Sequence, residues 1–171
     1  MNNISSLYVD LSNILKMTDS DIPVDTVFPE AAFSEFSDIC LCSPVILSGK
    51  IINLAGDLRI EAVLKFSAKH LCDRCLSSFV KDYELEFSDE IALDNSGREL
   101  DEYISYSNNR VLLTEAVYKC MFAEMGIKNV CRHDCKGLCG SCGKDLNSGE
   151  CTCMDDYIDP RLLKLKDFLK K

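Results

Sequence analysis

Cysteine spacing is the feature that most limits how this chain can fold. Eleven cysteines occur in 171 residues, and six of them lie between positions 131 and 153. Eight form close pairs, which are Cys72/Cys75, Cys131/Cys135, Cys139/Cys142 and Cys151/Cys153. Such pairs can place two thiolates about 4 Å apart around one metal ion, especially where a glycine such as Gly143 follows the second cysteine and permits a tight turn. We therefore expect zinc sites built from these eight residues.

Structural zinc fits this pattern better than disulfides or an enzyme. No signal peptide and no apolar run of about 18 residues is found, so we expect a cytoplasmic protein, in which thiols stay reduced. Sites made only of thiolates have no open position for catalysis, and the chain has just two histidines, His70 and His133. We therefore predict no enzymatic activity. A thiol redox switch or oxidoreductase that uses Cys72 and Cys75 is the alternative, although this pair lies between two predicted strands and not in a βαβ unit.

The chain has ligands for one zinc ion or two. In the nearest grouping, one site consists of Cys139, Cys142, Cys151 and Cys153, and the other of Cys72, Cys75, Cys131 and Cys135. A cross-braced arrangement of the same pairs is the first rival. A single site built from Cys135, Cys139, Cys142 and one member of the last pair is the second, and the sequence does not choose among them. The other three cysteines, Cys40, Cys42 and Cys120, are expected to be buried core residues.

Charge divides the chain near residue 127. Residues 1–127 carry 10 Lys and Arg against 21 Asp and Glu, whereas residues 128–171 carry 9 against 7. We predict an acidic β-rich body over 1–127, with one helix near 114–125, and a cysteine-rich zinc-binding tail over 128–171. A polar tail of this size lacks an adequate apolar core, and one structural zinc ion can supply about 10 to 16 kcal/mol of binding free energy.

Apolar periodicity predicts an α+β fold, with an antiparallel β-rich body, a few helices and a tail that ends in a short helix. Alternation of apolar and polar residues predicts neighbouring strands over 45–52, 58–68 and 79–87. An edge strand is expected over 7–11, and a loop with one short helix over 16–38.

Two helices are predicted from their end signals and apolar stripes. The first covers 114–125, with Thr114 as its N-cap and Gly126 at its end. The second begins at Asp159 and Pro160 and runs to the last residues of the sequence. An acidic adaptor that uses residues 159–171 as a partner helix is a third, weaker interpretation.

The cysteine segments resemble the YceD-like family, whose members are the large ribosomal RNA subunit accumulation proteins. The resemblance rests on Cys72-Asp-Arg-Cys75-Leu76, Asp134-Cys-Lys-Gly-Leu-Cys139, Cys142-Gly143, Asp145-Leu-Asn147, Cys151/Cys153 and Asp159-Pro-Arg161. It spans the chain from about residue 41 onward, and Gly140 departs from the proline often found between the two knuckle cysteines. It implies a non-enzymatic factor for accumulation of large-subunit ribosomal RNA. The implied partners are a large-subunit ribosomal RNA precursor or a ribosomal protein. No membrane and no small-molecule substrate is expected.

Any contact with RNA phosphates is expected in the tail. Its candidate residues surround the expected metal sites and are Arg132, Lys136, Lys144 and Arg161. A zinc ion with four thiolates carries a formal charge of about −2, which cancels the positive balance of the tail. RNA binding is therefore expected to be weak and salt-sensitive, or shared with a protein partner.

Overall fold

The chain is divided into two compact units. The computed structural model describes residues 8–36, 38–93, 103–126 and 128–153. One unit comprises Met1–His70 and Phe79–Ile127, and the other comprises Leu71–Ser78 and Lys128–Lys171. The second unit therefore takes its residues from two stretches that are far apart in the sequence.

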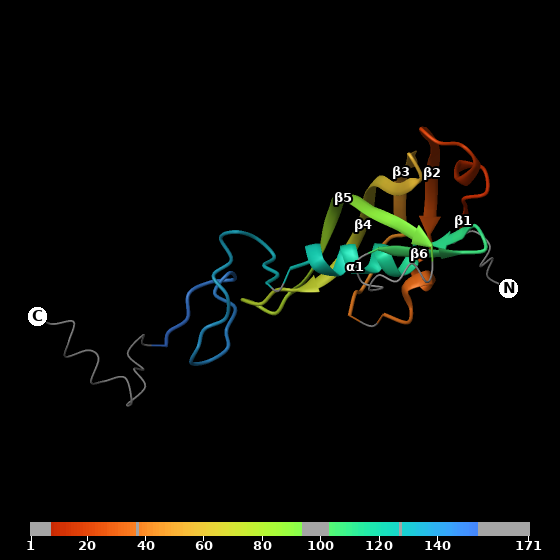
Figure 1. Ribbon diagram of the computed structural model, residues 1–171. Helices are drawn as coiled ribbons and strands as arrows, with labels where there is room; N and C mark the ends of the chain where they lie inside the picture. Colours follow the sequence, from red (N-terminus) through yellow and green to blue (C-terminus); the bar gives the residue numbers. More distant parts are fainter. Residues whose placement is uncertain (1–7, 37, 94–102, 127, 154–171) are drawn as a thin grey trace, which may run out of the picture. The chain divides into compact units, whose positions relative to one another are not determined.

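Among the described residues, seven strands form one sheet in the order β1-β7-β6-β5-β4-β3-β2 (Figure 1). They are β1 (Tyr8–Asp10), β2 (Ser20–Phe28), β3 (Val45–Leu54), β4 (Asp57–Leu71), β5 (Ser78–Leu93), β6 (Ile104–Ser107) and β7 (Arg110–Leu112). The pairs β1–β7, β2–β3, β3–β4 and β6–β7 are antiparallel, and β5–β6 is parallel. Strands β4 and β5 are neighbours joined by six residues, too few for a parallel crossover.

Alternating side chains place the core of the first unit on one face of this sheet. In β4, for example, Ile60, Leu64 and Phe66 are buried, whereas the residues between them are exposed or half-buried. Helix α1 (Thr114–Glu124) lies against that face (Figure 1) and adds Val117 and Met121 to the same apolar cluster. Burial of the apolar side chains that follow these strand and helix patterns is the main source of stability for the first unit.

The predicted α+β class, with a few helices, is wrong. In the described part of the chain, α1 is the single α-helix, accompanied by two short 3-10 helices, η2 (Ile14–Lys16) and η3 (Glu30–Phe33). The fold is mostly β-sheet. The tail helix predicted over 159–171 lies outside the described residues.

The class prediction failed because residues 20–28 were expected to be loop and instead form β2. Asp21, Pro23 and Asp25 disfavour a central strand, because proline donates no ladder hydrogen bond and buried carboxylates are costly. Strand β2 is the edge of the sheet, where such residues are tolerated and also discourage pairing with another chain.

The other predicted elements of the first unit are confirmed. Strands β3, β4 and β5 cover the three predicted ranges, and β1 forms the expected short edge strand. Helix α1 covers the predicted helix, and Gly126, with φ +68°, follows its carboxyl end. Thr114, however, is not the N-cap. It is the first helical residue, and its buried hydroxyl has no hydrogen-bond partner within the described ranges.

Asn53 fastens the amino-terminal segment to the turn between β3 and β4. Its side chain is 3% exposed. The Nδ2 group donates hydrogen bonds to the carbonyl oxygens of Ile14 at 2.8 Å and Met17 at 3.0 Å, and Oδ1 accepts one from the Gly56 N–H at 2.9 Å. One buried amide therefore satisfies three backbone groups from two segments.

Substitution Asn53→Ala should lower the free energy of unfolding of the first unit by about 2 to 4 kcal/mol, because the three hydrogen bonds of a buried amide are lost. Urea denaturation followed by circular dichroism measures the change. Ser48→Ala, at an exposed position of the same strand, is the matched control and should stay within about 0.5 kcal/mol of wild type. Equal stability of Asn53→Ala and the control would contradict this assignment.

Candidate metal centres

The structure brings eight cysteines together in two groups of four. Site A consists of Cys72, Cys75, Cys131 and Cys135, and site B consists of Cys139, Cys142, Cys151 and Cys153. Within each group all four sulfur atoms lie within 4.8 Å of one another. Both sites belong to the second unit. These two groups match the nearest grouping predicted from the sequence. They differ from the cross-braced arrangement, in which the pairs would be exchanged between the two sites.

The sulfur separations suit a tetrahedral metal ion. The Sγ atoms of Cys72 and Cys135 are 3.9 Å apart, those of Cys75 and Cys131 3.7 Å, and those of Cys139 and Cys151 3.4 Å. A disulfide requires a distance of about 2.05 Å between the two sulfur atoms, and all eleven cysteines are free. Tetrahedral zinc with metal–sulfur bonds of about 2.3 Å separates its ligands by about 3.8 Å. Each group can therefore hold a sulfur-preferring ion whose four coordination positions are all filled by thiolates.

The first two ligands of site A lie on the connection between β4 and β5. The Leu76 N–H donates to the Cys72 carbonyl at 2.8 Å, and the Cys72 N–H donates to the Ser77 carbonyl at 2.9 Å. These bonds close the turn around the pair, so that Cys72 and Cys75 present their sulfurs to one point. Leu76 has φ +59° in this turn and is 64% exposed.

Backbone and side-chain contacts hold this connection beside the second half of site A. The Asp73 N–H donates to the Asn129 carbonyl at 2.8 Å, and the Asn129 N–H donates to Asp73 Oδ2 at 2.6 Å. Arg74 Nη1 donates to the Cys135 carbonyl at 2.9 Å, and the Leu138 N–H donates to the Arg74 carbonyl at 3.0 Å. The two residues between the cysteines of the first pair therefore position the second pair.

Site B is built on a second tight turn. The Gly143 N–H donates to the Cys139 carbonyl at 2.9 Å, and the Cys139 N–H donates to the Lys144 carbonyl at 2.8 Å. Gly143 has φ +73°, in the region that favours glycine. Leu138 and Asp145 form an antiparallel bridge that closes the turn.

In each site, hydrogen bonds from backbone N–H groups lower the pKa of one cysteine and so favour the thiolate that a cation binds. Burial alone raises the pKa of the Cys72 thiol, but N–H groups of Cys131, Cys75 and Arg74 lower that pKa to about 6. N–H groups of Cys142 and Ser141 likewise lower the pKa of Cys139 to about 6. Hydrogen bonds to the thiolate favour the charged form.

A different thiol in each site keeps its proton in the absence of a cation. Burial, followed by hydrogen bonds with neighbouring cysteines, raises the pKa of Cys131 to about 12. The neighbouring Cys142 sulfur, followed by burial, raises the pKa of Cys153 to about 12. Adjacent thiolates repel one another, so a bound divalent ion is needed to keep all four sulfurs of a site deprotonated.

Two of the four predicted RNA-contact residues have side chains already engaged within the second unit. Arg132 Nη2 donates to Asn147 Oδ1 at 2.9 Å, and Lys144 Nζ donates to the Glu150 carbonyl at 2.7 Å. Lys136 is exposed, and Arg161 lies outside the described residues.

The expectation that Cys40 and Cys42 are buried is wrong, because both are exposed. Leu41 forms a bridge with Ala68 of β4 and packs against the core, so its two neighbours point to the opposite face of this strand-like segment. Sequence reasoning also assigned no role to Arg74 or Asn147, although both residues contact site A. The only signal was their place inside the cysteine motifs.

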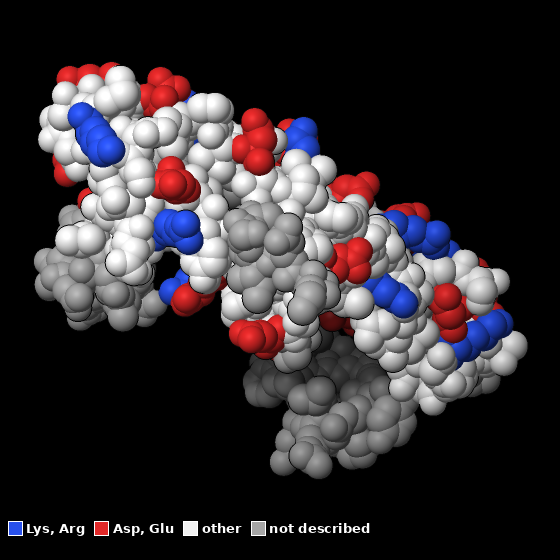
Figure 2. Space-filling model, turned by 90° about the vertical axis from the view of Figure 1, so that its right-hand side faces the viewer, with Lys and Arg blue, Asp and Glu red and all other residues white. Residues whose placement is uncertain are grey.

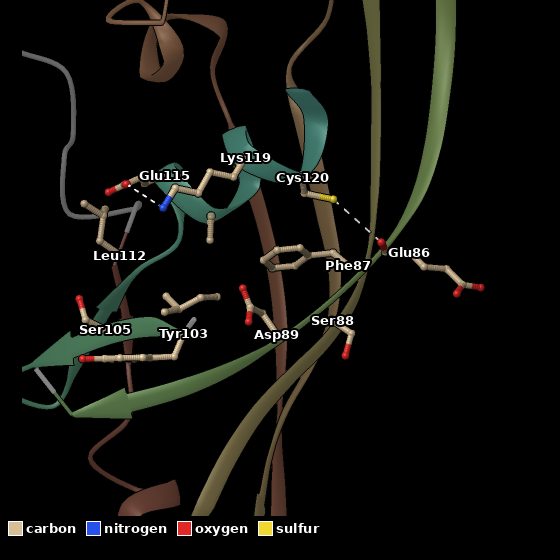
Figure 3. A pocket seen from close by; sticks show the side chains of 12 residues that line it. Glu86, Phe87, Ser88, Asp89, Tyr103, Ser105, Leu112, Glu115, Lys119 and Cys120 are labelled. Atoms are coloured by element: carbon tan, nitrogen blue, oxygen red, sulfur yellow. Dashed lines mark hydrogen bonds and ion pairs between the residues drawn. The ribbon is translucent and has the colours of Figure 1, made fainter. Parts of the chain in front are cut away.

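A hollow of about 500 Å³ lies between β5, β6 and α1 of the first unit (Figure 3). Glu115 and Lys119 on its wall pair with each other at 3.3 Å. The pKa of the Cys120 thiol is raised, first by burial and then by the negative charge of Glu124. The thiol faces the Glu86 carbonyl at 4.0 Å. A protonated thiol is a poor nucleophile, so this hollow lacks an activated cysteine.

The turns predict different effects of substitution at two equivalent positions, each directly after the second cysteine of a pair. Gly143→Ala should lower the stability of the metal-loaded second unit by about 1 to 2 kcal/mol, because a side chain is strained at positive φ. Leu76→Gly should cause no loss. Resistance of the metal-loaded proteins to thermal unfolding measures both effects.

Gly140→Ala is the control, since an added Cβ meets no atom within 4 Å at position 140 or 143, and only Gly143 has positive φ. Equal losses in Gly140→Ala and Gly143→Ala would show that backbone conformation is not the cause.

The model of the family described as large ribosomal RNA subunit accumulation protein YceD matches residues 60–169. The matched range covers more than half of the chain and includes all eight cysteines of sites A and B. Searches of curated proteins and of solved structures found no match. This chain belongs to the YceD family of large ribosomal RNA subunit accumulation proteins.

Proposed function

We propose that this protein is a non-enzymatic ribosome-biogenesis factor that supports accumulation and processing of large-subunit ribosomal RNA, with structural zinc at sites A and B. The observation that carries the proposal is the family match, because it spans both sites. Four thiolates fill the coordination shell of zinc, so the ion serves to hold the second unit in shape.

Burial in the second unit supports a structural role for the metal. Among its described residues, the buried side chains belong to Cys72, Cys75 and Cys135. No leucine, valine or other large apolar residue of this described part is buried. Hydrophobic burial therefore contributes little here, whereas a structural zinc ion contributes about 10 to 16 kcal/mol.

The charge of the second unit does not favour a partner that is bound mainly by long-range attraction to RNA phosphates. Residues 71–78 and 128–153 contain five Lys and Arg against four Asp and Glu. Two zinc ions with four thiolates each would add about four negative charges to this part of the chain. Figure 2 shows acidic side chains beside isolated basic ones on the face in view, with no continuous basic surface among the described residues there.

We therefore propose that a large-subunit ribosomal RNA precursor or a ribosomal protein is bound through short-range contacts. Arg132, Lys136, Lys144 and Arg161 remain the candidates for phosphate contact. Such binding would be weak and sensitive to salt if RNA were the sole partner. A cytoplasmic location belongs to the same proposal. Among the described residues, no helix is long and apolar enough to cross a membrane.

The lowered pKa of Cys72 favours the alternative of a thiol redox switch or oxidoreductase. A reactive thiolate must also reach its substrate, but Cys72 is 0% exposed and Cys75 is 8% exposed. Burial therefore favours metal ligation. Metal-free protein that reduces a model disulfide through this pair would support the redox alternative.

Freshly purified protein should contain two zinc ions per chain, one for each group of four sulfurs. Removal of two ligands by Cys72→Ala with Cys75→Ala should leave one ion, and Cys139→Ala with Cys142→Ala should also leave one. Elemental analysis of gel-filtered protein measures the content. Cys40→Ala with Cys42→Ala is the control and should retain two ions, because both thiols lie outside the sites. A wild-type protein without metal, or one with intramolecular disulfides, would refute the zinc assignment.

Depletion of the protein in its native host should lower the ratio of large-subunit to small-subunit ribosomal RNA. The wild-type chain and Cys40→Ala with Cys42→Ala should restore that ratio, whereas Cys139→Ala with Cys142→Ala should not, because the second unit loses a metal site. Quantitative electrophoresis of total RNA gives the ratio, and immunoblotting checks that the variants accumulate equally. An unchanged ratio after depletion would count against a role in ribosomal RNA accumulation.

A further inference from the structure

The side chain of Asn147 connects the loop of site B to a ligand of site A. Asn147 lies between Cys142 and Cys151 in the sequence, so both ends of its loop are ligands of site B. Its Nδ2 group donates to the Cys135 sulfur of site A at 3.5 Å. Its Oδ1 atom accepts a hydrogen bond from the Lys136 N–H at 2.9 Å. The amide thus binds both the ligand and the residue that follows it.

Neighbouring groups fix the orientation of this amide. Asn147 Nδ2 also donates to Asp145 Oδ1 at 2.7 Å, and the Asn147 N–H donates to the same oxygen at 2.9 Å. On the other side, Oδ1 accepts a further bond from Arg132 Nη2 at 2.9 Å. Donors therefore surround Oδ1 and acceptors surround Nδ2. A flipped amide would place donors against donors and lose these bonds.

The loop that carries Asn147 is also paired with the segment between the two sites. The Leu146 N–H donates to the Gly137 carbonyl at 2.9 Å, and Asp145 bridges Leu138. Gly137 and Leu138 themselves connect Cys135 of site A with Cys139 of site B. The position of Asn147 therefore depends on the same short segment that joins the two groups of ligands.

An N–H donor to a metal-bound thiolate stabilises that ligand and holds its direction. Partners of this kind commonly change metal affinity by about 10-fold to 100-fold without touching the ion. Since a metal at site B would hold both ends of the loop, it would reduce the freedom of Asn147 and favour its bond to Cys135. Linkage then requires that a metal at site A favours site B by the same factor.

We propose that Asn147 is a positioning residue that couples the two metal sites, so that occupancy of site B tightens metal binding at site A and the reverse. This inference rests on the proposed occupancy of both sites. Site B would lose its ion first, because its ligand Cys142 is exposed, whereas three ligands of site A are buried. Loss at site B would then weaken site A through Asn147.

A double-mutant cycle on the full chain tests the coupling. The four proteins are wild type, Asn147→Ala, Cys139→Ala with Cys142→Ala, and the combination of all three substitutions. Each is loaded with Co²⁺ or Zn²⁺ and titrated with a chelator of known affinity. Ion content is counted, and thiolate-to-cobalt absorption reports the ligands of the retained ions.

We expect Asn147→Ala to lower metal affinity at site A by about 10-fold to 100-fold when site B is intact. In the background without site B, the same substitution should have a clearly smaller effect. Asn147→Asp keeps the acceptor but replaces the N–H donor by a carboxylate oxygen beside the sulfur, so its loss should exceed that of Asn147→Ala and its cobalt absorption should shift.

Ser148→Ala is the matched control. The Ser148 hydroxyl donates to the Asp145 carbonyl at 2.7 Å within the same loop, and no contact with a sulfur is found for it among the described residues. Its metal affinity at site A should stay within about twofold of wild type. A loss equal to that of Asn147→Ala would show that general loop integrity, and not the amide bond to Cys135, is responsible.

Two further outcomes would overturn the coupling while leaving the proposed function intact. In one, Asn147→Ala and Asn147→Asp bind two ions with wild-type affinity. In the other, Asn147→Ala has the same effect with and without site B. Wild-type protein that binds neither Co²⁺ nor Zn²⁺ would instead overturn both this coupling and the zinc element of the proposed function.

Discussion

Thiolate coordination of metal ions at sites A and B, as proposed above, would be the interaction on which the second unit depends. The first unit buries an apolar cluster that includes Phe28, Leu64 and Met121, and its fold follows from ordinary sheet and helix packing. In the described part of the second unit, the buried side chains are cysteines of site A. One chain thus combines two sources of stability. Heat or denaturant opposes apolar burial in the first unit, whereas acid, oxidation and chelators would act directly on the metal–thiolate bonds proposed to order the second.

Chain connectivity makes the two metal sites unequal. Site B takes its ligands from positions 139–153, so its loop can close locally. Site A joins Cys75 to Cys131, which are 56 residues apart in the sequence. The intervening chain includes β5, β6, β7 and α1. Closure of so long a loop costs more conformational entropy unless the residues between are already folded. Assembly of site A is therefore tied to folding of the first unit, while site B needs only its own segment.

Local pattern identified the features that depend on local chemistry. Period-2 alternation predicted β4, and the Cys-x2-Cys spacing with Gly143 predicted a metal-binding turn. Features that depend on neighbours in space were missed. Pro23 can lie in a strand because β2 is an edge strand of the sheet. The position of β2 in the sheet order cannot be predicted from residues 20–28 alone. Likewise, nothing in Asp145-Leu-Asn147 reveals that an amide reaches the Cys135 sulfur, 12 positions away.

Electrostatics gives the metal a second consequence beyond folding. A cluster of four thiolates around zinc keeps a net negative charge, so each loaded site opposes the approach of RNA phosphate. Arg132 is held by Asn147, and Lys144 by the Glu150 carbonyl, so neither charge is displayed on a freely mobile side chain. Recognition in ribosome assembly would then have to use the shape of the second unit and a few oriented donors, and not a surplus of positive charge. Loss of either metal would remove that shape while making the unit less negative, so a metal-free chain would lose specificity before it lost attraction for RNA.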